Sequence, residues 1–330
     1  ILLSAFIFVI IVACGNGEVS ESSKLENMPE VLNVYTSQIE EVYKPIIKEF
    51  EERTGIWVKV QTGGSAELLQ EIDDESADPV CDVMFGGAAE LHEIYKDCFE
   101  EYTPKDFDKV HDFLKDSPSI SIPFSLNPLV IVYNTKLVPQ NQTPDKWEDL
   151  FDDKWSGKIA FADPEVSGAS FISLSLISQL YDNDGFEAVT DFSGILNGTV
   201  LDRSEMIMDS LIEGRYNIGI TTEGEAYKAS INRKEVSYAY PAEGTCFIVD
   251  SMSVIKNSPN RENAQMFVDF LVNKDIQKLL PGQMYRRSVL TELDAPEGMM
   301  ETGLIKEDAY SDSWTVSNYG KIMDSWHRGM

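Results

Sequence analysis

The sequence is poor in basic residues. Its 330 residues hold 27 Lys and Arg against 56 Asp and Glu, which gives a formal net charge of −29. Nucleic-acid binding needs a basic face that neutralises phosphates, and charge-driven docking on an anionic membrane needs basic clusters, so this composition excludes both. Because 43% of the residues are hydrophobic, the chain has enough apolar surface to fold into globular domains.

Histidine and the common catalytic motifs are also scarce. Only three His occur, and the motifs of serine hydrolases, P-loop proteins, zinc peptidases and dinucleotide-binding folds are all missing. His92 and His111 lie in acidic or amphipathic surroundings and are expected at surface or capping positions. The sequence therefore predicts a protein that is not an enzyme and uses no cofactor.

Long hydrophobic runs are missing, apart from a short one at residues 1–13. A membrane-spanning helix needs roughly 20 apolar residues, so this run fits the apolar region of a secretory signal better. The run ends in Ile11-Val12-Ala13-Cys14, which resembles a bacterial lipobox, in which the Cys receives a lipid. Residues 14–30 are rich in Gly, Ser, Glu and Asn, as in a flexible tether. We expect a protein of the cell envelope that is anchored through Cys14 to the outer face of a bacterial membrane; a core strand ending in Cys14 is the alternative.

Cysteine is rare as well. Apart from Cys14, the chain contains Cys81, Cys98 and Cys246, an odd number for an exported protein. Two interpretations remain open: Cys81 and Cys98 form a disulfide, or all three cysteines are buried free thiols. No CxxC pair and no Cys/His ligand spacing is present, so the sequence predicts no structural zinc site.

From residue 31 onward, strand patterns alternate with helix patterns. Three short β-rich runs with amphipathic helices between them predict a βαβαβ unit, and hence a parallel sheet covered by helices. The same alternation continues through the middle of the chain. Strands are expected at 31–35, 57–62, 81–85, 129–133, 158–162, 216–221 and 245–255, and the longer helices of the second part at 167–180, 204–213 and 259–271.

Four turns between a strand and a helix are rich in Gly, Ser and Thr. In open α/β sheets, ligands bind at the carboxyl ends of the strands, and the helix N-termini that meet there favour anions. Ser and Gly also start helices for local reasons, so the signal comes from the four turns together. They lie at 36–37, 63–65, 86–88 and 167–170, and they predict a ligand-binding cleft.

Several longer motifs occur in a recognisable order. They are VLNVYTS (31–37), FEERTGIWVKV (50–60), YNTKLVP (133–139), DPEVSGAS (163–170), YPAEGT (240–245) and PNRENAQMFVDFLV (259–272). Over roughly residues 31–290, this order resembles the extracellular solute-binding proteins of ABC importers. The most similar branch is the ferric-ion-binding type, which also includes proteins that bind thiamine, phosphoglycerate, hexose phosphates and 2-aminoethylphosphonate.

This resemblance implies a type II periplasmic-binding-protein fold. Two α/β lobes with parallel-rich sheets would be joined by two hinge strands, and the solute would bind between them. Lobe 1 would contain residues 31–125 and 251–330, and lobe 2 residues 126–250. A monomer that delivers its solute to the permease subunits of an importer is expected.

The resemblance also bears on metal binding. In the iron binders, a His and a Glu from the first lobe and a Tyr pair from the second hold the ferric ion. The matching segments here contain Thr36–Ile39, Gly86-Gly87 and Thr222–Glu225, so none of these ligands is present and no metal site is predicted. A ferric-ion carrier is the alternative, and it would need tyrosines outside the family positions, such as Tyr238 or Tyr240.

The part of the family site that holds an anion is present. Its Ser-Gly-Ala turn corresponds to Ser167-Gly168-Ala169, and the start of a following helix to Arg203-Ser204, where Arg203 is suited to a bidentate phosphate contact. We therefore expect a phosphorylated or phosphonate solute, with Glu223 or Glu243 receiving an amine or sugar hydroxyls. Arg286-Arg287 is either a second basic site or a surface pair. The expected ligand-binding residues are Ser37, Gly64, Ser65, Gly87, Ala88, Ser167, Gly168, Ala169, Ser170, Arg203, Ser204, Thr222, Glu223 and Glu243.

Overall fold

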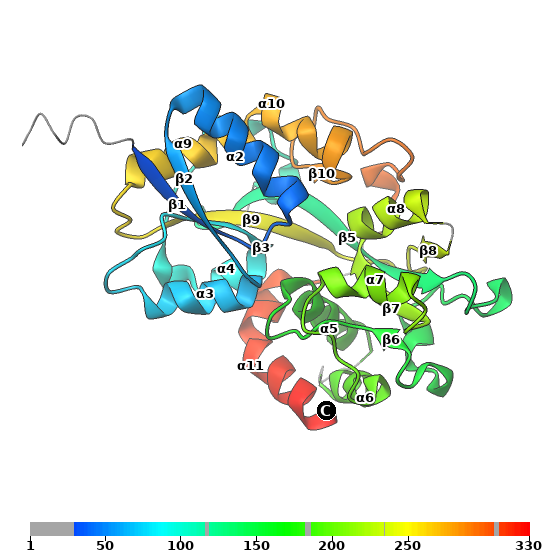
Figure 1. Cartoon of the computed structure of the whole chain (residues 1–330). Helices are drawn as coiled ribbons and strands as arrows, with labels where there is room; N and C mark the ends of the chain where they lie inside the picture. Colours follow the sequence, from blue (N-terminus) through cyan, green and yellow to red (C-terminus); the bar gives the residue numbers. More distant parts are fainter. Residues whose placement is uncertain (1–29, 116–118, 182–185, 234, 307–309) are drawn as a thin grey trace, which may run out of the picture.

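A computed structural model describes residues 30–115, 119–181, 186–233, 235–306 and 310–330. Figure 1 shows two α/β halves, one coloured blue, cyan and yellow to orange and the other mainly green, with strands β5 (Ile122–Asn134) and β9 (Phe247–Ile255) running between them. The signal-like run, Cys14 and all of the tether except Glu30 lie outside the described residues. No helix in the described part of the chain is long and apolar enough to cross a membrane.

The first half begins with the predicted βαβαβ unit. Strand β1 (Val31–Thr36) pairs in parallel with both β2 (Trp57–Thr62) and β3 (Val83–Ala88), and helices α2 (Glu40–Thr54) and α3 (Ser65–Asp74) make the crossings. Helix α2 buries Val42, Ile46 and Phe50 against this sheet because they share one helical face. It ends at Gly55, whose φ of 78° is readily adopted only by glycine.

The sheet is mixed. In the described residues ten strands join, and the central order is β2-β1-β3-β9-β5-β7-β6. Parallel pairing is confined to β1 with its two neighbours and to β6 (Ile159–Ala160) with β7 (Ile218–Thr222), whereas the other pairs are antiparallel. The α/β class is confirmed.

Strands β5 and β9 connect the halves. They pair with each other in an antiparallel way, and β5 then continues into the second half, where it pairs with β7 and with β8 (Val236–Ala239). The two lobe boundaries expected from the sequence fall on these strands and lie opposite each other, because Ser125 pairs with Asp250 and Leu126 with Val249. The chain therefore passes from one half to the other at two positions that lie side by side on the paired strands β5 and β9.

The C-terminal helix α11 (Asp312–Gly329) does not follow the expected division, which assigned all of 251–330 to lobe 1. It packs on α5 (Gly168–Tyr181) and α6 (Glu187–Leu196) of the second half as well as on α4 (Ala89–Ile94) of the first. The Thr315 hydroxyl lies 2.7 Å from that of Ser175. The apolar residues of α11, such as Trp326, belong to a core that includes residues of both halves, so burial of this face decides where the helix lies.

The remaining elements complete the two halves. Their bounds are α7 (Glu205–Ile212), α8 (Glu223–Asn232), α9 (Arg261–Val272), α10 (Lys274–Gln277), β4 (Phe99–Glu100), β10 (Arg287–Ser288), a π-helical turn at Leu280–Met284, and 3-10 turns at Lys96–Cys98, Phe107–Lys109, Asp112–Leu114, Gln140–Gln142, Glu148–Phe151, Asp153–Trp155 and Thr302–Leu304.

Cys81 and Cys98 form no disulfide, so the bridge that the sequence left open is absent. Both are buried. The Cys81 Sγ lies 3.2 Å from the carbonyl oxygen of Val83, and the Cys98 Sγ lies 3.4 Å from Oδ1 of Asp73. Burial raises the pKa of the Cys98 thiol to about 11.

Candidate functional site

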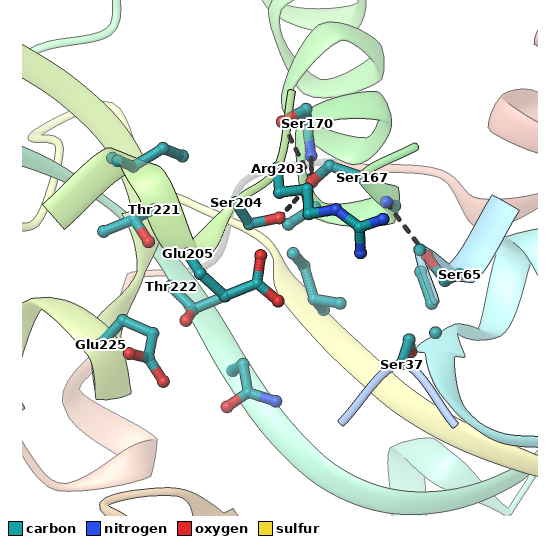
Figure 2. A pocket seen from close by; sticks show the side chains of 18 of the residues that line it. Ser37, Ser65, Ser167, Ser170, Arg203, Ser204, Glu205, Thr221, Thr222 and Glu225 are labelled. Carbon is teal, nitrogen blue, oxygen red and sulfur yellow. Dashed lines mark hydrogen bonds between the residues drawn. The ribbon is translucent and has the colours of Figure 1, made fainter. Parts of the chain in front are cut away.

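A cavity of about 160 Å³ lies between the two halves, next to β5 and β9. Figure 2 shows polar side chains that reach it from both sides. Of the residues expected to bind the ligand, all except Glu223 and Glu243 line this cavity. They are Ser37, Gly64, Ser65, Gly87, Ala88, Ser167, Gly168, Ala169, Ser170, Arg203, Ser204 and Thr222.

One wall of the cavity is the start of helix α5. The Ser167 hydroxyl accepts hydrogen bonds from the Ser170 N–H at 3.2 Å and from the hydroxyls of Ser170 and Ser204 at 3.1 and 2.8 Å. These contacts join the first turn of α5 to the residue that precedes α7. The first turn of a helix carries a partial positive charge, and here the N–H groups of Gly168 and Ser170 donate to serine hydroxyls, so the Ala169 N–H and these hydroxyls are the groups that this wall offers to an oxyanion.

The opposite wall is the irregular end of strand β3, where the backbone turns at Gly86 and Gly87 and leads directly into α4. Gly86 and Gly87 have φ values of 112° and 97°, and a Cβ on Gly86 would lie 2.6 Å from the hydroxyl of Ser37. Only glycine fits this turn. The turn can therefore pack closely against Ser37 and Ser65, which line the cavity together with Gly87.

His92 supports this turn from behind. It is completely buried, not at a surface or capping position as expected, because its ring packs beneath the turn with Nε2 2.9 Å from the carbonyl oxygen of Gly86. Its Nδ1 lies 2.6 Å from the hydroxyl of Ser253. Burial lowers the pKa of His92 to about 4, so the ring is neutral near pH 7.

The two halves touch beside the cavity. The Gly168 N–H donates to the hydroxyl of Ser65 at 3.2 Å. A Cβ on Gly64 would lie 2.4 Å from Cγ1 and 2.6 Å from the carbonyl oxygen of Val166. The close approach of the halves therefore depends on the missing side chain at Gly64.

Arg203 precedes helix α7 and extends into the cavity (Figure 2). Among the described residues, its guanidinium has no hydrogen bond or ion pair. Glu205, the first residue of α7, and Glu225, in the first turn of α8, also line the cavity. Neither carboxylate was among the expected ligand-binding residues, and their position near helix starts was the signal in the sequence that could have indicated them.

Asp250 and Arg286 complete the site from strand β9 and the segment before β10. The Arg286 guanidinium donates to the Asp250 carboxylate at 2.5 Å and to Oε1 of Gln38 at 2.8 Å. Asp250 also accepts from the Gly87 N–H at 3.3 Å and from Asn127 at 3.3 Å. Arg286 is thus part of the cavity wall, not of a surface pair.

Glu223, which was expected to contact the ligand, does not line the cavity. Its carboxylate turns away from the cavity and is buried against Arg287, whose Nε and Nη2 donate to it at 2.8 Å each. The Tyr240 hydroxyl donates to the same carboxylate. Both carboxylate oxygens of Glu223 therefore accept hydrogen bonds inside the protein.

Glu243, the other carboxylate expected to contact the ligand, is also held by other groups. It accepts from the Tyr181 hydroxyl at 2.7 Å and from the Trp147 N–H at 3.3 Å, and it is not part of the cavity lining. Trp147 is completely buried and donates its ring N–H to the carbonyl oxygen of Gly244. The YPAEGT segment is therefore held against Trp147, away from the solute cavity.

The residues considered for iron have other contacts. Tyr238 and Tyr240 do not line the cavity, and burial together with Glu223 raises the pKa of Tyr240 above its usual value. A raised pKa disfavours the tyrosinate that would bind a ferric ion. In the described residues, no group of three or more His, Cys, Asp and Glu side chains is arranged to hold a metal ion.

Comparison with known proteins identifies relatives of similar length. The chain is 24% identical to Iron uptake protein A1 of Synechocystis over 318 residues, which cover 91% of this chain and 87% of the relative. The fold matches AfuA from Actinobacillus pleuropneumoniae, solved with fructose-6-phosphate, with a TM-score of 0.83, 20% identity and coverage of 90% and 97% of the two chains. It also matches iron-bound HitA from Pseudomonas aeruginosa, with a TM-score of 0.78, 21% identity and coverage of 90% and 99%.

These matches confirm the two-lobed periplasmic-binding-protein fold that the motif order predicted. The model of one protein family, described as bacterial extracellular solute-binding protein, matches residues 75–300, which is more than half of the chain. That range includes the β3–α4 turn, the start of α5, Arg203 and both connecting strands. The chain therefore belongs to the bacterial extracellular solute-binding proteins.

Proposed function

We propose that this protein is the substrate-binding component of an ABC importer and captures a small phosphorylated or phosphonate solute in the cavity between its halves. It acts as a receptor and not as an enzyme. Closing of the two halves around the solute would be a hinge motion at β5 and β9, and the solute would favour the closed state through its contacts with both halves. AfuA, whose structure holds fructose-6-phosphate, supports a phosphorylated solute.

One observation carries this proposal. The Arg203 guanidinium has no partner among the described residues and lies in the same cavity as the Ser167-Gly168-Ala169 turn. A phosphate or phosphonate would accept two parallel hydrogen bonds from Arg203 and further ones from N–H and hydroxyl groups at the start of α5. An unpaired arginine beside a helix N-terminus is the arrangement that such an anion needs.

The net charge of −29 does not oppose this assignment. At physiological ionic strength the Debye length is about 8 Å, so distant surface carboxylates are largely screened. The groups within the cavity therefore decide the affinity, while the overall field slows the encounter with an anion.

The proposed partners follow from the same role. A solute-binding protein of an importer delivers its solute to permease subunits, and a lipid on Cys14 would keep this protein near them on the outer face of the membrane. We propose that it acts there as a monomer.

A ferric-ion carrier is the second candidate. It is favoured by the names of two relatives, Iron uptake protein A1 and iron-bound HitA. In this chain, iron binding would require Tyr240 to leave Glu223 and lose its proton. Tyrosinate-to-iron charge transfer would then give a visible absorption band.

The test is a thermal-shift screen of the full chain. The compounds are 2-aminoethylphosphonate, sugar phosphates, phosphoglycerates, inorganic phosphate, thiamine, carboxylates and ferric citrate. A solute at about 1,000 times its Kd adds roughly 4 kcal/mol to the free energy of unfolding, which shifts Tm by several degrees. A shift confined to phosphorylated or phosphonate compounds supports the proposal. A shift with ferric citrate alone, together with a visible band, would overturn it.

A further inference from the structure

The charged side chains in the cavity do not balance one another. Arg203, Glu205, Glu225, Asp250 and Arg286 line it. Arg286 and Asp250 form an ion pair, with side chains that are 12% and 16% exposed. In the described part of the chain, the other three have no side-chain hydrogen bond or ion pair, which leaves one guanidinium and two carboxylates facing the cavity.

The two carboxylates lie on the same side of the cavity as Arg203 but on different helices. Figure 2 shows Glu205 extending from the start of α7 beside Arg203, and Glu225 on the far side of Thr222 at the start of α8. Acidic residues in a first helical turn interact favourably with the helix dipole. That effect acts equally on side chains that point to solvent, so it does not account for two carboxylates in one solute cavity.

The carboxylates of Glu205 and Glu225 would repel a purely anionic solute. Like charges repel each other more strongly in a cavity that partly excludes water than in bulk water. A phosphate on Arg203 would thus be repelled by Glu205 unless the solute itself carried a positive group. Carboxylates also accept hydrogen bonds from sugar hydroxyls, but hydroxyls would not neutralise the two charges.

We infer that the solute is zwitterionic, with its phosphate or phosphonate held by Arg203 and the start of α5, and a protonated amine held between Glu205 and Glu225. This inference rests on the proposed function, whose site it extends. Glu205 and Glu225 thus take the role of receiving an amine, which the sequence led us to expect of Glu223 or Glu243. A zwitterion also approaches a protein of net charge −29 with less repulsion than an anion does.

Isothermal titration of the full chain with three matched compounds tests the inference. Phosphoethanolamine, 2-hydroxyethyl phosphate and ethyl phosphate differ only in the group at one end. We expect phosphoethanolamine to bind at least about tenfold more tightly than the other two. Putrescine, a diamine without phosphate, is not expected to bind.

Two variants locate the effect. Glu205→Gln and Glu225→Gln keep the side-chain size but remove one charge, so each is expected to reduce the preference for phosphoethanolamine over ethyl phosphate, and the double variant to abolish it. Affinity for ethyl phosphate should stay the same or increase. Glu213→Gln is the matched control, because Glu213 lies at the other end of α7 and pairs with Arg215.

The outcomes separate the two proposals. If ethyl phosphate or 2-hydroxyethyl phosphate binds as tightly as phosphoethanolamine, or if the preference survives in the double variant, the zwitterion inference is overturned and the proposed function stands. If putrescine alone binds, or if no compound of this set and no phosphorylated or phosphonate compound of the thermal-shift screen binds, the proposed function is overturned as well.

Discussion

Arg287 and Glu223 form a bidentate ion pair that joins the C-terminal segment of the first half to the start of helix α8 in the second. Both hydrogen bonds measure 2.8 Å, and the two side chains are only 2% and 1% exposed. Arg287 also donates to the carbonyl oxygen of Met300 and to the hydroxyl of Thr302. Every donor-bearing nitrogen of this guanidinium is therefore satisfied inside the protein.

Removal of one partner of this pair should destabilise the fold. Glu223→Gln leaves the buried guanidinium without its counter-charge, and breaking a buried pair in this way costs about 3–5 kcal/mol. Denaturant unfolding followed by circular dichroism measures the loss. Glu40→Gln, which removes the partner of Lys44 in an exposed pair, should change nothing measurable. A Glu223→Gln variant as stable as that control would show that the pair does not hold the fold.

Gly64 should control closure of the two halves. In Gly64→Val, the new side chain would collide with Val166, whose carbonyl oxygen lies 2.6 Å from the position of the added Cβ. The variant is expected to fold normally but to stay more open and to bind its solute at least about tenfold more weakly, since a solute is bound most tightly when it contacts both halves. Small-angle scattering and titration measure the two effects.

The matched control for closure is Gly320→Ala on helix α11. An added Cβ there meets nothing within 4 Å. Its radius of gyration and affinity should equal those of the unchanged chain. If Gly64→Val bound as tightly as Gly320→Ala, the contact between Gly64 and Val166 would have no part in closure.

Arg203 should carry most of the affinity for an anion. Arg203→Ala combined with Ser167→Ala should abolish binding of a phosphorylated solute while the circular dichroism spectrum stays unchanged. Arg203→Lys should bind at least tenfold more weakly than the unchanged chain, because an ammonium keeps the charge but cannot make two parallel hydrogen bonds. Titration checks both, with Arg215→Ala as the control, since Arg215 is exposed and lies outside the cavity lining. If the variant with both Arg203→Ala and Ser167→Ala bound the solute with unchanged affinity, the anion would have to bind at another site.

Glu90 should give the stability a pH dependence. Burial, together with the nearby Asp312, raises the pKa of Glu90 to about 7, and the Tyr310 hydroxyl donates to its Oε1 at 2.9 Å. The folded state therefore binds more protons than the unfolded state between about pH 4.5 and 7. This contribution is fully present below that window and is lost as the pH rises through it, by up to about 3 kcal/mol.

Glu90→Gln isolates this effect, because a glutamine keeps the oxygen that accepts from Tyr310 but does not titrate. The difference in free energy of unfolding between Glu90→Gln and the unchanged chain should grow in favour of the variant from pH 5 to pH 7.5 and then level off. Denaturant unfolding at several pH values measures it. Parallel pH curves for the two proteins would mean that Glu90 titrates normally in the folded state.

Much of the fold and the cavity could be predicted from the sequence because the signals are local. The β1, β2 and β3 strands, the helices between them and the Gly- and Ser-rich turns follow from hydrophobic periodicity and capping chemistry. Once these strands form one sheet, their carboxyl ends meet at one edge. Ser37, Ser65 and Gly87 are brought together in this way, although they are far apart in the chain.

Other features have no such local signal. Helix α11 is amphipathic, but its sequence does not indicate which half its apolar face will cover. His92 looked like a surface residue because its neighbours are polar, yet the tertiary structure uses it to support the Gly86-Gly87 turn. Cys81 and Cys98 are both buried and unbridged, and neither their number nor their spacing in the sequence indicated this.

The sequence by itself determined that two short segments near the cavity each carry two like charges, Glu223 and Glu225 in one and Arg286 and Arg287 in the other. Only the tertiary structure decided which residue of each segment faces the solute. Glu223 and Glu225 are about 200° apart around helix α8, so they point to opposite sides. Arg286 immediately precedes strand β10 and Arg287 is its first residue, and the side chains of successive residues in extended backbone point to opposite sides. Glu223 and Arg287 meet in the core, and this pairing leaves Glu225 and Arg286 at the cavity, because burial of a charge requires an opposite charge beside it.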